Sequence, residues 1–257
     1  STLQTAAGNI ALTGIGQTAN SGTYHDGVYV ESASTITSSG GNIAISGTGK
    51  GTNTWGVEVD GAGTLVESTS ASTAKSLTIV GTTVADTNAN VGVLVSGGAK
   101  ISVASAVLGL TGYGDTSGAG SSSIGVDITG ANTLVRITAT DGTISITGSA
   151  GSGSGGSNVG VQVENTALVS ANAAGQITIS GKGGAGPNSH GVNVITAADI
   201  VSVGGSAAQT PNITISGLAG PGATSDGVRI DGAGTTVQTA KADVVMSGVT
   251  SGLDTIA

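Results

Sequence analysis

Residues 177–201 read ITISGKGGAGPNSHGVNVITAADIV and contain three short apolar runs. The first is ITISG at residues 177–181, the second is GVNV at residues 191–194, and the third is the pair Ile200–Val201. In GVNV the two valines are separated by one residue, so both side chains point to the same side of a β-strand. The runs are separated by Gly, Ala, Asn, Asp and Ser, which favour turns. This stretch therefore predicts three short strands joined by turns.

The same three runs recur along the chain. The first run ends, with some drift, at eight glycines: Gly14, Gly47, Gly81, Gly112, Gly148, Gly181, Gly217 and Gly248. The GVxV or GVxI run begins at seven: Gly27, Gly56, Gly92, Gly125, Gly160, Gly191 and Gly227. A looser patch follows each of these, at Thr35–Ile36, Leu65–Val66, Ile101–Val103, Leu134–Val135, Leu168–Val169, Ile200–Val201 and Val237. Because both glycine series have a mean period near 33 residues, the chain is a repeat protein.

Three strands of this length bury little surface alone, but stacked units form three parallel sheets around a common core. The inward positions of the second run are all β-branched, which favours strands: Val28/Val30, Val57/Val59, Val93/Val95, Val126/Ile128, Val161/Val163, Val192/Val194 and Val228/Ile230. We therefore predict an all-β fold, a right-handed parallel β-helix with three short strands per coil, about 33 residues per coil and 7–8 coils. The glycine that opens each GVxV run is expected to turn a tight corner with positive φ.

One domain is expected to cover residues 1–257, with coils repeating from about residue 8 and no evident caps. Length varies mainly between the first and second runs, where the two glycines are separated by 9 to 13 positions. The low complexity of these connections favours surface loops free of core constraints. The alternative is a row of stacked loops that forms a binding edge. Pro187 and Pro221 lie in these loops, and Pro211 opens a strand run, where a ladder tolerates proline.

The composition excludes several classes of protein. Of 257 residues 47 are Gly, none is Cys and none is Phe, and the net charge is −8. Seven scattered cations make no basic surface, so a nucleic-acid partner is not expected. The chain contains no apolar run of the roughly 20 residues that a membrane span needs. The absence of Cys excludes disulfides and thiolate chemistry.

Two outward rows accompany the GVxV strands and hold the candidate carboxylates. One row is Tyr29, Glu58, Leu94, Asp127, Gln162, Asn193 and Arg229; the next is Glu31, Asp60, Ser96, Thr129, Glu164, Ile195 and Asp231. Glu58 with Asp60, or Glu31 beside Asp60 one coil on, suggests paired carboxylates or a Ca²⁺ site. Calcium needs six to eight oxygens from a concentrated loop, and polysaccharide-cleaving sites gather acids and bases on neighbouring coils. A solvated acidic face is therefore favoured, and no metal is assigned.

Histidines and cations are scattered. His25 and His190 lie five repeats apart, about 24 Å at the coil spacing, so they share no site and are expected to be exposed corner residues. Arg136 and Arg229 are three repeats apart, and no cluster forms among Lys50, Lys75, Lys100, Lys182 and Lys241. DGAGT, which begins at Asp60 and again at Asp231, is interpreted as a turn rather than a phosphate cradle. No catalytic residue and no cofactor are assigned.

The outward face of the first strand is rich in Ser and Thr. Its pairs are Ala11/Thr13, Ala44/Ser46, Thr78/Val80, Gly109/Thr111, Ser145/Thr147, Thr178/Ser180, Thr214/Ser216 and Val245/Ser247. A regular Thr-x-Thr ladder suggests ice binding, but Ala, Gly and Val interrupt this one, which favours a mildly polar sheet face. Exposed aromatic residues stack on sugars, but Tyr24, Tyr29, Trp55 and Tyr113 follow no further pattern.

Residues 40–68, GGNIAISGTGKGTNTWGVEVDGAGTLVES, and residues 142–171, GTISITGSAGSGSGGSNVGVQVENTALVSA, resemble the repeat regions of large secreted bacterial surface proteins. The similar groups are filamentous-haemagglutinin-like exoproteins of two-partner secretion and autotransporter passengers. This resemblance implies an extracellular β-helical stalk on the bacterial cell surface that displays adhesive parts to host or biofilm. Its partners would be other cell-surface or matrix components.

We therefore expect a non-enzymatic stalk segment of a bacterial adhesin or fibre. The alternative is a subunit of an extracellular filament or surface layer, joined end to end through exposed sheet edges. A carbohydrate-active β-helix enzyme and an ice-binding protein are less favoured.

Overall fold

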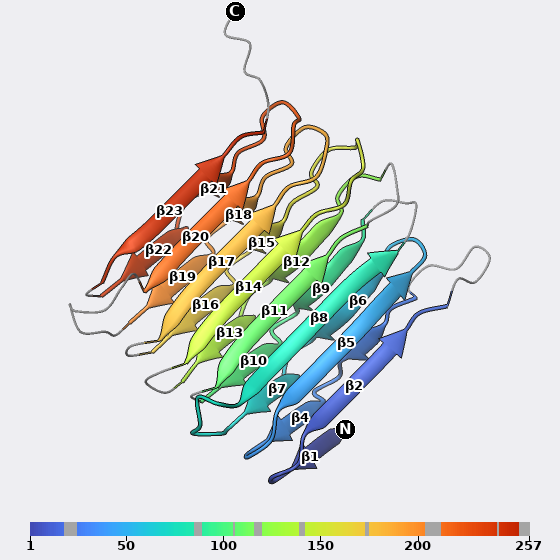
Figure 1. Cartoon of the computed structure of the whole chain (residues 1–257), viewed down its shortest axis with the longest axis vertical. Coiled ribbons are helices and arrows are strands. Elements are labelled where there is room, and N and C mark those ends of the chain that lie inside the picture. The colour runs from blue at the N-terminus through green and yellow to red at the C-terminus, as the bar shows by residue number, and fades with distance from the viewer. Residues whose placement is uncertain are drawn as a thin grey trace, which may run out of the picture.

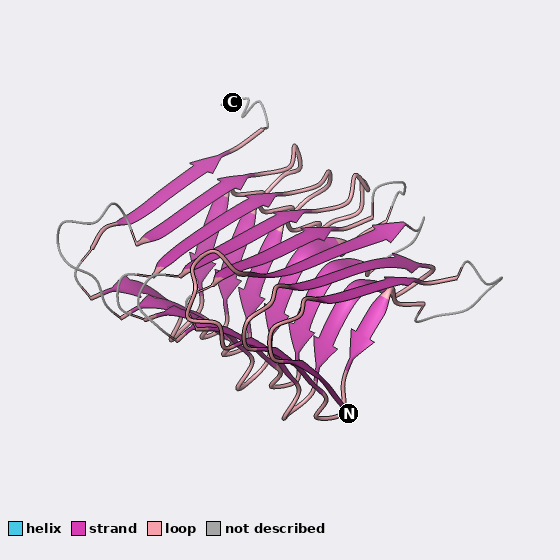
Figure 2. Cartoon of the chain, turned by 60° about the horizontal axis from the view of Figure 1, so that its bottom comes forward, coloured by secondary structure: helices cyan, strands magenta, loops and turns pink. Residues whose placement is uncertain are grey.

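The computed structural model describes residues 1–17, 25–84, 89–104, 106–115, 120–138, 142–172, 175–203, 212–240 and 242–251. These residues form strands, turns and loops without a helix (Figure 2), so no helix in this part of the chain is long and apolar enough to cross a membrane. The strands are arranged in three parallel sheets, which confirms the predicted all-β solenoid.

Each coil contributes one strand to each sheet. Sheet A contains β1 (Thr2–Thr5), β4 (Thr35–Ser38), β7 (Leu65–Ser68), β10 (Lys100–Val103), β13 (Leu134–Ile137), β16 (Leu168–Ala171), β19 (Asp199–Ser202) and β22 (Thr236–Thr239). Sheet B contains β2 (Ile10–Ile15), β5 (Ile43–Lys50), β8 (Ser76–Val84), β11 (Val107–Tyr113), β14 (Thr143–Ser149), β17 (Gln176–Lys182), β20 (Ile213–Leu218) and β23 (Val244–Val249). Sheet C contains β3 (Val28–Val30), β6 (Trp55–Asp60), β9 (Val91–Ser96), β12 (Ile124–Thr129), β15 (Val161–Glu164), β18 (Val192–Ile195) and β21 (Val228–Asp231).

The coils follow one another from the N-terminal to the C-terminal end of the solenoid (Figure 1). Paired residues of adjacent coils are 29 positions apart at Val28 and Val57 and 37 apart at Asp199 and Thr236. The predicted motifs still align, because the first valines of all seven GVxV or GVxI runs are register partners along sheet C. The connections therefore absorb the differences in coil length. Right-handed winding remains the expectation for parallel crossovers.

The core is a column of Val, Ile, Leu and Ala that all three sheets enclose. The predicted inward pairs from Val57/Val59 to Val192/Val194 are completely buried. In the last coil the packing ends, and Ile230 is 39% exposed. The fold is thus stabilised by apolar burial repeated in every coil, without the large aromatic residues of most cores.

Two columns of glycine bring sheets B and C into backbone contact. A Cβ atom added at Gly47 would lie 1.9 Å from the carbonyl oxygen of Gly56, and one at Gly181 would lie 1.9 Å from that of Gly191. The same contact joins Gly14 with Gly27, Gly81 with Gly92, Gly112 with Gly125, Gly148 with Gly160, and Gly217 with Gly227. The expectation that the opening glycine adopts positive φ is wrong, since none of these seven does. Gly is needed there because no side chain fits between the two backbones.

Positive φ occurs instead at the turn after each sheet C strand. In the two DGAGT segments, Gly61 and Gly63 have φ of 92° and 85°, and Gly232 and Gly234 have 95° and 83°. This confirms that DGAGT is a turn signal. In other coils the same turn places non-glycine residues in the left-handed region: Ser32, Ala33, Asn132, Asn165, Thr166, Thr196 and Ala197.

The connections between sheets B and C are stacked on one another rather than free surface loops. A buried or half-buried polar residue lies two positions before each of the seven opening glycines: His25, Thr54, Asn90, Ser123, Asn158, Ser189 and Ser225. In four pairs of adjacent coils this side chain accepts a hydrogen bond from the backbone N–H of the equivalent residue in the preceding coil. The donor and acceptor residues are Thr54 and Asn90 (3.2 Å), Ser123 and Asn158 (2.9 Å), Asn158 and Ser189 (3.2 Å), and Ser189 and Ser225 (2.9 Å). The Asn158 amide also donates to the carbonyls of Gly153 and Ala185, at 2.8 and 2.9 Å. The expectation of unconstrained loops is therefore wrong for these residues.

Replacement of Gly181 by Ala tests the glycine contact. The added methyl group would collide with the Gly191 carbonyl, so sheets B and C must separate locally and stability falls. We expect Gly181→Ala to lower the free energy of unfolding by at least about 2 kcal/mol, measured by chemical denaturation. The control is Gly109→Ala on the outward face of sheet B, where the nearest heavy atoms lie 3.8 Å from the new Cβ and stability should be nearly unchanged. Equal effects of the two substitutions would contradict the proposed role of the contact.

Candidate functional site

The outer face of sheet C carries the candidate residues. Strand register places Tyr29, Glu58, Leu94, Asp127, Gln162, Asn193 and Arg229 side by side in successive coils, and we call this set the central row. The sequence analysis predicted this alignment correctly. The row has two chemically different parts, an acidic part toward the N-terminal end and a part with amides and Arg229 toward the C-terminal end.

The expectation of a solvated acidic face is wrong for two members of the central row. Glu58 is 6% exposed and Asp127 is 8% exposed, although both side chains point away from the core. A period of two determines which way a side chain points and leaves open how much of it is exposed to water. Burial of a carboxyl group favours its neutral form.

Three carboxyl groups lie near Glu58. Burial, together with the charges of Asp26, Asp60 and Glu31, raises the pKa of Glu58 to about 8. Asp60 accepts a 2.7 Å hydrogen bond from the Ser96 hydroxyl. The structure thus brings together the predicted carboxylates Glu31, Glu58 and Asp60.

Asp26 and Tyr29 join the same cluster. Asp26 accepts a 2.8 Å hydrogen bond from the Trp55 backbone N–H, and burial raises its pKa. Loss of solvation and the charge of Glu58 raise the pKa of Tyr29 to about 12. The sequence analysis missed Asp26, although its position directly before Gly27 of the GVYV run was a signal. In the described part of the chain, no three His, Cys, Asp or Glu side chains are placed to hold a metal ion.

Asp127 occupies the middle of the central row. Burial, together with the charge of Glu164, raises its pKa to about 8. Among the described residues its Oδ1 atom has no hydrogen-bond partner. Asp127 is therefore a buried, predominantly neutral carboxyl group at pH 7, beside Gln162 of the next coil.

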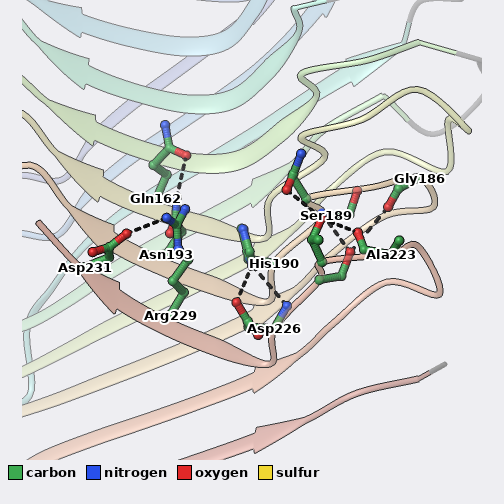
Figure 3. Close-up of polar contacts among 12 residues, drawn as sticks. Gln162, Gly186, Ser189, His190, Asn193, Ala223, Asp226, Arg229 and Asp231 are labelled. Atoms are coloured by element: carbon green, nitrogen blue, oxygen red, sulfur yellow. Dashed lines mark hydrogen bonds and ion pairs between the residues drawn. The ribbon is translucent and has the colours of Figure 1, made fainter. Parts of the chain in front are cut away.

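A groove of about 410 Å³ lies over the C-terminal part of the central row. Its lining residues are Ser122, Ile124, Ser157, Val159, Gln162, Asn188, His190, Asn193, Ile195 and Arg229. Asn193 is 4% exposed and donates a 3.3 Å hydrogen bond from Nδ2 to Oε1 of Gln162. Figure 3 shows Gln162, Asn193 and Arg229 on neighbouring strands, with His190 to one side.

The environment of His190 differs from the predicted exposed corner. His190 is 4% exposed, and its Nδ1 atom accepts a 3.0 Å hydrogen bond from the backbone N–H of Asp226. The Asp226 carboxylate lies 3.4 Å from the same nitrogen (Figure 3). Burial lowers the pKa of His190, the Asp226 charge raises it, and that of Arg229 lowers it. His190 is thus a neutral structural acceptor at pH 7, and the prediction of exposure was wrong.

The other candidates do not converge on this face. His25 is half-buried rather than exposed and lies five strands away from His190 along sheet C. Arg136 belongs to β13 in sheet A, whereas Arg229 belongs to β21 in sheet C, where it forms a 2.5 Å ion pair with Asp231. The described lysines lie on or beside strands of sheets A and B: Lys50, Lys75, Lys100 and Lys182. Tyr24, Pro211 and Lys241 lie outside the described residues.

The predicted Ser/Thr rows lie on the outer face of sheet B, where successive positions align in register from Thr13 to Ser247. Val80 and Gly109 interrupt the rows, as the sequence indicates. A shallow groove of about 400 Å³ follows this face from Thr147 to Ser247. Its lining residues, as far as the structure describes them, are mainly Ser and Gly.

Comparison with known proteins gave no match to a protein-family model, a curated protein or a solved structure.

The buried carboxyl groups predict how stability changes with pH. In the folded chain Glu58 and Asp127 keep their protons up to about pH 8, whereas in the unfolded chain they ionise near pH 4. Between these pH values the folded chain therefore binds more protons, so the free energy of unfolding falls as pH rises from about 4 to about 8 and levels off above 8. The lowered pKa of His190 makes the free energy of unfolding rise with pH, but only below the ordinary pKa of 6.5. We expect Tm to drop by roughly 5 °C or more between pH 6.5 and 8.5.

The double variant Glu58→Gln and Asp127→Asn should remove most of this pH dependence, because neither amide titrates. Glu67→Gln on the outer face of sheet A serves as the control and should leave the slope unchanged. Differential scanning calorimetry at both pH values measures the effect. A Tm that is equal at both pH values in the unsubstituted chain would contradict the assignment.

Proposed function

We propose that this chain is a non-enzymatic structural solenoid, the stalk segment of an extracellular bacterial adhesin or surface fibre. The observation that carries the proposal is the unbroken stack: three parallel sheets and one apolar column continue through all the described coils. Hydrogen bonds between strands run along the long axis of such a stack, so each coil is attached to the next by many bonds in parallel.

A spacer role also agrees with what the side chains do. The buried histidine and the stacked Asn158 and Ser189 have structural hydrogen-bond partners. The proposed location on a bacterial surface rests on the likeness of the repeats to secreted surface proteins and on the absence of Cys. The proposed partners are cell-surface or matrix components.

Removal of one complete coil tests the modular stalk. Ile144 and Ile177 are register partners, so deletion of residues 144–176 joins Thr143 to Ile177 and leaves every later strand in phase. We expect a folded solenoid with unchanged strand content and cooperative unfolding, measured by circular dichroism and calorimetry. Deletion of residues 144–160 is the control, since it removes half a coil and places strands of different sheets opposite one another. A coil deletion that unfolds as completely as the half-coil deletion would contradict the proposal.

A second candidate function is a self-assembling filament subunit. The observation that favours it is the apolar surface at both ends of the described solenoid, where the outer edges of β1, β2 and β3 and of β22, β23 and β21 are unpaired. Leu3 is 42% exposed at one end, and Met246 is 51% exposed at the other. Met246 is the register partner of the buried Ile215, so a further coil would cover it.

Light scattering and electron microscopy distinguish the two functions. A filament subunit should form fibres whose length increases with concentration, and Met246→Lys should prevent them by placing a charge at the stacking surface. Val245→Lys is the matched control, because Val245 is 44% exposed on the same strand but points outward. Fibres that Met246→Lys abolishes and Val245→Lys preserves would support the filament function. Monomers at all concentrations would leave the stalk as the proposal.

A further inference from the structure

We propose that the groove over the C-terminal part of sheet C binds a neutral linear oligosaccharide aligned with the axis of the solenoid. This inference goes beyond the structural role and does not depend on it. It concerns the groove floored by Gln162, Asn193 and Arg229, with Asp127 directly adjacent in register.

Polar groups without partners are the first argument. Asn193 is 4% exposed and lines the groove, and its Oδ1 atom has no hydrogen-bond partner among the described residues. Asp127 is 8% exposed, and its Oδ1 atom likewise has no hydrogen-bond partner among the described residues. Buried polar atoms are costly when they are left unpaired, and each one calls for an explanation. Asn193 lines the groove, so a ligand that donates a hydrogen bond there would satisfy its Oδ1 atom.

The amide pair determines which ligand chemistry fits. Asn193 Nδ2 donates to Gln162 Oε1, so this contact uses one donor group and one acceptor. The pair retains the acceptor Asn193 Oδ1 and the donor Gln162 Nε2, one coil apart. A hydroxyl group both donates and accepts, and adjacent hydroxyls on a sugar ring match one acceptor beside one donor. Asp127, the register partner of Gln162, lies one coil further on, outside the groove lining.

Apolar walls complete the match to a sugar. Ile124, Val159 and Ile195 also line the groove beside the amides. Their apolar side chains can pack against the C–H faces of a pyranose ring. The wall is also rigid. Backbone N–H groups of Ser122 and Ser157 donate hydrogen bonds of 2.9 and 2.8 Å to carbonyls of the next coil. A preformed groove reduces the entropy that binding would otherwise lose.

Charge excludes polyanions from this groove. The guanidinium of Arg229 is already paired with Asp231 at 2.5 Å, and the Glu164 carboxylate lies close enough to raise the pKa of Asp127. Acidic groups thus outnumber the one cation around the groove, and a uronate or phosphate polymer would be repelled. An uncharged ligand has no such penalty.

The repeat of the row favours a linear ligand. Asp127, Gln162, Asn193 and Arg229 follow one another at the strand spacing of about 4.8 Å. This spacing is similar to the length of one sugar unit in an extended chain, so successive residues of an oligosaccharide would meet successive coils. The groove lies on a sheet face rather than at an edge, and therefore an extended peptide cannot add to the sheet by main-chain hydrogen bonds.

The test measures binding of the complete chain to a panel of neutral hexasaccharides: cellohexaose, mannohexaose, maltohexaose, laminarihexaose and chitohexaose. Isothermal titration calorimetry supplies the affinity, with hexagalacturonate and an uncharged extended hexapeptide as comparison ligands. We expect at least one neutral hexasaccharide to bind. Asn193→Ala and Gln162→Ala should each weaken that binding about tenfold or more, whereas Gln238→Ala, an amide removed from the exposed face of sheet A, should not.

Circular dichroism and Tm establish whether each variant is folded. Because Gln162 is only half-buried, Gln162→Ala should fold and therefore tests the groove even if Asn193→Ala does not fold. Three results would overturn the proposal: no binding of any neutral hexasaccharide at millimolar concentration, preferential binding of hexagalacturonate or the peptide, or binding that neither groove substitution changes.

Discussion

Direct contact between two glycine backbones in every complete coil is the constraint on which this solenoid depends. The glycine that ends each sheet B motif meets the glycine that opens the next sheet C strand, and in all seven pairs an added Cβ would lie within 1.9 Å of the opposing carbonyl oxygen. This contact closes the cross-section on one side and directs the intervening connection outward. It also fixes where each sheet C strand begins, so the valines behind it enter the core at the same height in every coil. Sheet register, core composition and loop stacking follow from it.

The sequence predicted the architecture well because its information is repeated. The strand motifs, the β-branched inward pairs and the alignment of the central row recur in each coil, so drift in one unit is corrected by the others. It predicted burial on the outer face poorly. Glu58 and Asp127 occupy positions that alternation assigns to solvent, and His190 occupies a corner that was expected to be exposed, yet all three are buried. Alternation describes which way a side chain points, whereas exposure depends on what packs over it. Nor does the presence of glycine reveal whether positive φ or close approach requires it, as Gly56 and Gly61 illustrate.

The outer face of sheet C combines two kinds of chemistry on one regular scaffold. Around Glu58, burial and the charges of neighbouring carboxylates raise the pKa of Glu58, which couples stability to pH. Around Asn193 the amides, one ion pair and apolar walls form a groove. Because the backbone is nearly the same in each coil, a change of side chain at one row position alters the local chemistry without a change of fold. This explains how a structural repeat could carry a ligand groove while the rest of the coil remains a spacer.

The register has a further consequence for how the chain folds. Among the described strands, partners are never more than 37 positions apart, and the separation stays between 29 positions at Val28 and Val57 and 37 at Asp199 and Thr236. The entropy lost when two partners meet depends on the segment between them, so it does not grow with the number of coils. Each new coil can therefore dock on the one before it without waiting for distant parts of the polypeptide. Growth in length leaves the folding problem unchanged, which allows very long solenoids to be assembled one turn at a time.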